Sequence, residues 1–272
     1  MRKFLSLLVV VVCLFGVIPP QTSSVLAAND SNMEEDYKEL MSVIKSKVLD
    51  GWSEEEIGKL PIVSDFKNKY SEEQIARFLN SKVEVYNQDK VEKKLSETKI
   101  HSNGNQLIEF EDGSFIYIKG SIKKLNQDNS EPVAIEDNVA LPASKMYSTQ
   151  GKSGDKFSVN NTVEFWGIYL AARAVLNTDF TIYTNKITVN RAHTGGSKGI
   201  YPTTLQTHGT NISSNNTKTP STDGSFTKVN GVVIGGQPIG FSHTFTLITD
   251  IRLLKVSDNG AIVVGYTNSS VQ

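Results

Sequence analysis

The chain has a single cysteine, Cys13, and this cysteine lies inside an N-terminal segment typical of an export signal. The segment starts with Arg2 and Lys3, continues as an apolar run over residues 4–18 and ends in small residues at Ala27 and Ala28. A basic start, an apolar stretch too short to span a bilayer and a small-residue exit define a secretory signal peptide. We therefore expect residues 1–28 to be removed after Ala27 or Ala28. The secreted chain that remains can form no disulfide, so burial of apolar side chains must stabilise its fold.

Charged residues are distributed unevenly along the chain. Residues 28–150 carry 16 basic and 23 acidic side chains, whereas residues 151–272 carry 10 basic and 6 acidic ones. This mild asymmetry suits two modules that attract each other, or a weakly cationic face near anionic envelope polymers. It is far from the strongly basic pattern of a nucleic-acid-binding protein. The polar C-terminal residues give no sign of a transmembrane helix in the mature chain.

The first half of the chain has the pattern of a small helical module. Apolar residues recur at helical spacing over residues 33–48, which predicts an amphipathic helix that ends near Gly51. Residues 52–57 and 70–75 repeat one pattern, in which Ser53 and Ser71 are followed three positions later by Glu or Gln. Both repeats predict a helix start with a capping box. We expect Pro61 to end the first of these two helices and the second to continue toward Leu95.

Two Asx-Gly pairs between apolar, alternating runs predict β-hairpins. Asp112–Gly113 separates residues 107–111 from 114–118, and Asn259–Gly260 separates residues 251–256 from 261–266. A two-residue turn at such a pair fixes which residues lie opposite each other. The expected cross-strand pairs are Phe110 with Phe115, Ile108 with Tyr117, Val256 with Val263 and Leu253 with Tyr266.

The second half of the chain is rich in Thr, Val, Ile, Asn and Gly, which favours β-strands. Residues 241–247 alternate between apolar and polar, and residues 165–176 carry apolar side chains on both faces. The latter segment fits a buried strand or a short core helix, and its surroundings favour the strand. Residues 194–230 are mostly Gly, Ser, Thr and Asn, and we interpret them as a long polar loop that is mobile, functional or contains a weak strand near residues 201–205.

These patterns predict an α+β protein. We expect a small helical N-terminal module with a terminal β-hairpin at residues 29–125, a linker at residues 126–155 and a β-rich domain at residues 156–272. The last of these should be an antiparallel β-sandwich-like domain, with an irregular barrel as the alternative.

No segment carries the spacing of a known catalytic motif. The Gly-rich residues 193–199 and 231–240 match neither the phosphate-loop nor the dinucleotide-binding spacing. The four histidines are scattered, with no pair at metal-ligand spacing, so we expect no metal and no cofactor. His243 is expected to be a hydrogen-bonded core residue. The best ligand-binding candidates lie along the polar loop and are His193, Lys198, Tyr201 and His208.

The sequence therefore favours a binding function over catalysis. We expect a secreted, non-enzymatic binding or interaction protein of the bacterial cell envelope or extracellular space, whose partner is an envelope or host-surface component. One alternative is a toxin-like protein that inserts β-hairpins into membranes. Another is a secreted hydrolase with a site assembled from loops. The sequence specifies neither the ligand nor the oligomeric state.

Overall fold

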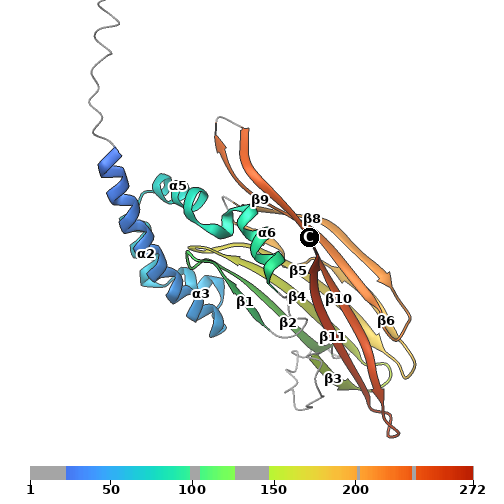
Figure 1. Ribbon diagram of the computed structural model, residues 1–272. Coiled ribbons are helices and arrows are strands. Elements are labelled where there is room, and N and C mark those ends of the chain that lie inside the picture. Colours follow the sequence, from blue (N-terminus) through green and yellow to red (C-terminus); the bar gives the residue numbers. More distant parts are fainter. Residues whose placement is uncertain (1–22, 99–104, 126–146, 201–202, 235–236, 272) are drawn as a thin grey trace, which may run out of the picture.

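A computed structural model describes residues 23–98, 105–125, 147–200, 203–234 and 237–271. It shows an α+β protein in which the N-terminal helices lie at one end of two antiparallel β-sheets, as the sequence predicts (Figure 1). The expected signal peptide lies mostly outside the described residues. None of the helices in the described part of the chain is both long and apolar enough to cross a membrane.

The helical end starts with the long helix α2, whose apolar stripe is fully buried at Leu40, Met41 and Ile44. Burial of side chains of this size stabilises a fold by roughly 1.5–3 kcal/mol each. Gly51, at φ +84°, follows the last turn and closes it, as expected. The helices are α2 (Ser23–Leu49), α3 (Glu54–Gly58), α4 (Pro61–Lys69), α5 (Glu72–Lys82), the 3₁₀ helix η1 (Glu84–Tyr86) and α6 (Gln88–Glu97).

Both predicted capping boxes are present, at the starts of α3 and α5. Two other expectations for this region are wrong. Pro61 does not end a helix but occupies the first turn of α4, where the missing N–H of proline has no helical partner to lose. The helix expected to reach Leu95 is broken, because Val83 and Asn87 are extended and the Asn87 side chain caps α6 instead.

The two sheets contain eleven strands in the described part of the chain. The first sheet has the order β1-β2-β4-β5-β6, with β7 paired to β5, and the second has the order β3-β11-β10-β9-β8. The first-sheet strands are β1 (Gln106–Glu109), β2 (Phe115–Leu125), β4 (Lys156–Trp166), β5 (Leu170–Ile182), β6 (Ile187–His193) and β7 (Lys198–Gly199). The second-sheet strands are β3 (Tyr147–Gly151), β8 (Thr203–Ser214), β9 (Ser221–Ile234), β10 (Gln237–Val256) and β11 (Ile262–Val271).

Both predicted hairpins form, but their registers differ by one residue from the prediction. Each loop has three residues rather than two, because Gly113 (φ +89°) and Gly260 (φ +80°) take the left-handed conformation at the third position. The loops are closed by hydrogen bonds from Phe110 N to Ser114 O and from Ser257 N to Ala261 O. The observed pairs are therefore Leu107 with Tyr117, Ile108 with Ile116, Val256 with Ile262, and, after a further shift in β10, Ile251 with Tyr266.

Residues 165–176 are strand, as favoured, but they contribute to two strands: β4 ends at Trp166 and β5 begins at Leu170. Residues 194–230 are not a long loop, since most of them form β7, β8 and β9, and the alternative of a strand near residues 201–205 is confirmed in part by β8, which begins at Thr203. The side chains of β8 are mostly exposed, so a strand can form there without any apolar alternation. Part of the expected linker is also strand: Tyr147–Gly151 pairs with β11 as β3, while residues 126–146 lie outside the described residues.

One apolar core joins the helices to both sheets. It includes side chains of α2, η1, β2, β4, β5, β9 and β10, for example Leu40, Tyr86, Phe165 and Phe245. A second, smaller core fills the far end of the sandwich around Phe157 and Phe180. The helical module is thus packed onto the sandwich through a shared core.

Candidate functional site

A groove of about 940 Å³ lies on the outer face of the first sheet. Its floor consists of the outward-facing side chains of β2, β4 and β5. Along β4, Phe157 and Val159 point into the sandwich, whereas Asn160, Thr162 and Glu164 belong to the groove. The period-2 alternation of a strand therefore separates core from site.

Strand pairing arranges the floor in cross-strand rows. Neighbouring rows are two residues apart along each strand, which corresponds to about 7 Å. Four rows thus extend over about 20 Å. In order they are Tyr117, Glu164 and Arg173; Lys119, Thr162 and Val175; Ser121, Asn160 and Asn177; and Lys123, Ser158 and Asp179, of which all but Asp179 line the groove.

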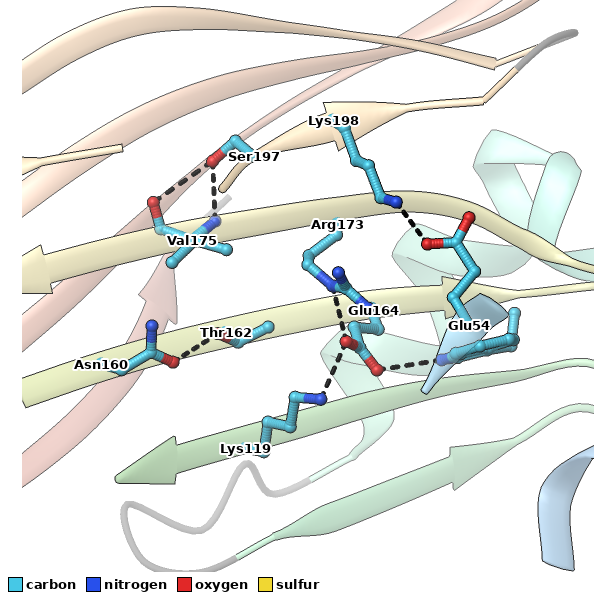
Figure 2. Close-up of polar contacts among 10 residues, drawn as sticks. Glu54, Lys119, Asn160, Thr162, Glu164, Arg173, Val175, Ser197 and Lys198 are labelled. Atoms are coloured by element: carbon cyan, nitrogen blue, oxygen red, sulfur yellow. Dashed lines mark hydrogen bonds and ion pairs between the residues drawn. The ribbon is translucent and has the colours of Figure 1, made fainter. Parts of the chain in front are cut away.

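The walls come from segments distant in sequence. One wall is the corner between α2 and α3, with Trp52 and Ser53, and the other is the turn between β6 and β7, with Gly195 and Gly196. Ser197 holds this turn against β5, since its hydroxyl accepts a hydrogen bond from Val175 N and donates one to Val175 O. An ion pair between Lys198 and Glu54 joins the two walls (Figure 2).

Glu164 is the centre of charge in the floor, and its side chain is only 1% exposed. One carboxylate oxygen lies 2.9 Å from Lys119 Nζ and accepts a hydrogen bond of 2.7 Å from Arg173 Nε. The other accepts a hydrogen bond of 3.1 Å from Trp166 Nε1 (Figure 2). Burial alone would raise the pKa of Glu164, but the two cations and the indole N–H outweigh it and hold the pKa below its usual value. The carboxylate is therefore ionised, with both oxygens occupied.

Amide and hydroxyl groups form a polar track beside this centre. Asn160 donates to Asn177 at 2.9 Å and accepts from the Thr162 hydroxyl at 2.6 Å, and Asn177 donates to Gly195 O. These bonds hold the side chains in fixed orientations. The Asn160 and Asn177 amides are partly exposed and have donor or acceptor capacity left for a ligand, because an amide can form several hydrogen bonds, whereas Thr162 is buried beneath them.

The groove is cationic overall. Among its described lining residues, Lys119, Lys123, Lys124 and Arg173 are basic and Glu164 is the only acidic one. Lys124 is paired with Asp155 at 2.5 Å, but Lys123 forms no ion pair with any described residue. After these pairings the floor retains two positive charges, one at the Glu164 cluster and one at Lys123.

Aromatic side chains complete the lining. Trp52 stands on one wall with 40% of its surface exposed, and Lys47 Nζ lies 4.5 Å from the centroid of its ring. Trp166 and Tyr117 lie at the helical end of the floor. The chain contains two tryptophans, and both line the groove.

The four sequence candidates are only partly associated with this groove. Lys198 bridges the walls, and His193 Nδ1 accepts a hydrogen bond from Gly195, which lines the groove. His208 lies in the other sheet, on β8, where it shares a hydrogen bond with Thr227. Tyr201 lies outside the described residues. In the described part of the chain, none of these four forms a hydrogen bond or ion pair with another.

The residues that define the floor were not identified from the sequence. Lys119, Glu164 and Arg173 each interrupt an apolar segment, and a charged residue at an outward position of a buried-looking strand is the signal that could have identified them. His243 is buried, as expected, with its Nδ1 at 3.3 Å from Glu92. Among the described residues, no group of three His, Cys, Asp or Glu side chains is placed to hold a metal ion.

Comparisons of the chain with protein-family models, with curated proteins and with solved structures found no match.

Proposed function

We propose that this chain is a secreted, non-enzymatic binding protein of the bacterial envelope or extracellular space that holds an extended polysaccharide in the groove. The observation that carries the proposal is the polar track of Asn160, Thr162 and Asn177 along the floor of a groove whose walls and end carry aromatic residues. Fixed amides and hydroxyls match the hydroxyl groups of a sugar chain. Exposed tryptophan offers an apolar surface with a polar edge for the sugar rings.

The state of Glu164 supports binding rather than cleavage. Hydrolysis of a glycosidic bond commonly requires two carboxyl groups, one of them protonated to act as a general acid. Glu164 is the only acidic residue among the described lining residues, its pKa is lowered, and its oxygens are occupied by Lys119, Arg173 and Trp166. It can neither donate a proton to a leaving group nor readily accept one from water.

The length of the floor supports an extended ligand. Four rows over about 20 Å, with polar side chains in each, favour a chain of several sugar units over a single small molecule. The groove follows the strand direction, so the ligand would lie along β2 and β4.

Obstruction of the groove tests this proposal. Ser121 lies in the third row of the floor, so Ser121→Phe should fill the track while suiting a β-strand. The matched control is Thr244→Phe, at an exposed position of β10 in the other sheet. Affinity electrophoresis through gels that contain a panel of soluble polysaccharides measures binding.

We expect at least one polysaccharide to retard the wild type and the Thr244→Phe variant but not the Ser121→Phe variant. Equal retardation of all three proteins, or no retardation in any gel, would refute the groove as a polysaccharide site. Release of new reducing ends from a bound polysaccharide would refute the non-enzymatic part of the proposal.

A further inference from the structure

We infer that the groove selects polysaccharides that carry acidic groups, and that it holds them at two anion subsites on its floor. The first subsite is formed by Lys119 and Arg173, and the second by Lys123. This inference rests on the proposed function and specifies the chemical class of its ligand.

The first subsite follows from the charge balance around Glu164. Two cations, Lys119 and Arg173, share this one carboxylate, which leaves one positive charge without a counter-charge from the described residues. Arg173 uses its Nε atom for Glu164, and no described residue accepts a hydrogen bond from its two Nη groups. A guanidinium with free Nη groups is suited to bind a carboxylate or a phosphate through paired hydrogen bonds.

The second subsite is four residues farther along β2. Lys119 and Lys123 project from the same face of this strand, because they are an even number of residues apart, and about 13 Å separates their backbone positions. Lys123 has no ion pair with a described residue, whereas its neighbour Lys124 is neutralised by Asp155. Ser121 and Asn160, which form part of the third row of the floor, lie between the two subsites.

The cost of removing water from the two positive charges makes the groove discriminate between acidic and neutral sugar chains. A neutral sugar chain seated in the groove would remove water from Arg173 and Lys123 without replacing it by an opposite charge, which is unfavourable. A chain with acidic groups at a matching spacing would supply those charges. The groove therefore favours acidic chains and also opposes neutral ones.

Isothermal titration calorimetry with matched probes tests the inference. The probes are oligogalacturonate, which carries a carboxylate on each unit, its uncharged methyl ester and polyglycerol phosphate, which carries phosphodiesters. The variant is Lys123→Met, and its matched control is Lys255→Met, at an exposed position of β10. Each titration is repeated at about 1 M salt, where charges are screened beyond about 3 Å.

For the wild type we expect oligogalacturonate to bind about tenfold or more tightly than its ester, and high salt to remove this difference. Lys123→Met should weaken oligogalacturonate about tenfold, leave the ester unchanged and reduce the salt dependence, whereas Lys255→Met should change nothing. Polyglycerol phosphate could instead bind and be weakened by Lys123→Met, while oligogalacturonate does not bind. In that case the groove still selects acidic chains, and the acidic group that it recognises is a phosphodiester.

Equal binding of oligogalacturonate and its ester would overturn the acid selectivity and leave the polysaccharide site intact. An unchanged affinity of Lys123→Met for every acidic probe would overturn the second subsite. If neither acidic probe binds while a neutral polysaccharide is retarded in the electrophoresis, the inference is wrong and the proposed function stands.

Discussion

Among single residues, Glu164 and Lys228 are both buried but are accommodated in opposite ways. Glu164 is surrounded by two cations and an indole N–H, as described above. Lys228 on β9 is 1% exposed and has no acidic partner among the described residues. Its Nζ donates a hydrogen bond of 2.8 Å to Val85 O and lies 4.5 Å from the centroid of the Phe165 ring. Burial lowers the pKa of Lys228 to about 7.

The lowered pKa makes stability depend on pH in a defined direction. In the unfolded chain Lys228 has a pKa of about 10.4. Between pH 7 and 10 the unfolded state therefore binds a proton that the folded state does not, so the free energy of unfolding rises with pH over this window. We expect Lys228→Met to be about 2 kcal/mol more stable than the wild type at pH 6 and about 2 kcal/mol less stable toward pH 10, where the native amine is neutral.

Urea denaturation at a series of pH values from 6 to 10 measures this effect. The wild type should gain up to about 4 kcal/mol relative to the variant over this range, since each unit of pKa difference corresponds to about 1.4 kcal/mol. The exposed Lys255→Met variant should follow the wild type. Parallel pH profiles for wild type and Lys228→Met would show that Lys228 is not a neutralised buried amine.

Among helices and strands, the helix caps and the positions of the hairpin turns could be predicted from the sequence, whereas the strand registers could not. The repeated Ser-Glu-Glu patterns predicted both capping boxes, because a capping box depends on four consecutive residues. In both hairpins the Asx-Gly pair was identified, but the loop has three residues. Asp112 Oδ1 accepts from Ser114 N and Asn259 Oδ1 from Ala261 N, which favours the longer loop with glycine at its third position.

Glycine-to-alanine substitutions at Gly260 and at Gly58 test the role of the glycine at the third loop position. Gly260 has φ +80° and open space around it, so Gly260→Ala should destabilise the protein by about 1 kcal/mol through backbone strain alone. Gly58, in the last turn of α3, also has open space but no positive φ. Gly58→Ala should therefore stabilise by about 0.5–1 kcal/mol. Thermal denaturation of both variants measures these changes, and a Gly260→Ala variant as stable as the wild type or more stable would contradict the assigned loop conformation.

Strand β8 and the groove floor illustrate what the sequence could not give. The β8 side chains are polar and mostly exposed, so the strand depends on backbone hydrogen bonds to β9 rather than on an apolar pattern. The floor combines residues from β2, β4 and β5 whose juxtaposition depends on register. Glu164 and Arg173 lie opposite each other only because of the pairing around the turn at residues 167–169. Residue type alone could not indicate that these charges converge.

At the scale of the whole molecule, the helical end and the sandwich depend on each other. Leu40 of α2 belongs to the same core as Phe165 and Phe245 of the facing sheets. Lys228 and Asn230 of β9 also donate hydrogen bonds to the carbonyls of Val85 and Tyr86 in η1. The helices are thus fastened to the sheets by both apolar and polar contacts.

This shared core predicts cooperative unfolding. Leu40→Ala removes a fully buried side chain and should destabilise the protein by about 2–5 kcal/mol. The loss should appear equally in the helical and the sheet signals of circular dichroism, with a single transition. Two separate transitions, with the sheet signal unaffected by the substitution, would contradict a common folding unit.

If an acidic sugar chain occupies the groove, tryptophan fluorescence should report its binding. Both tryptophans line the groove, and Trp52 is far more exposed than Trp166, which is 1% exposed. Titration with oligogalacturonate should shift or quench the emission of the wild type in a saturable way, and Trp52→Phe should remove most of the change. If calorimetry detects bound oligogalacturonate while the emission of both tryptophans stays unchanged, the ligand binds outside the groove and the proposed site is wrong.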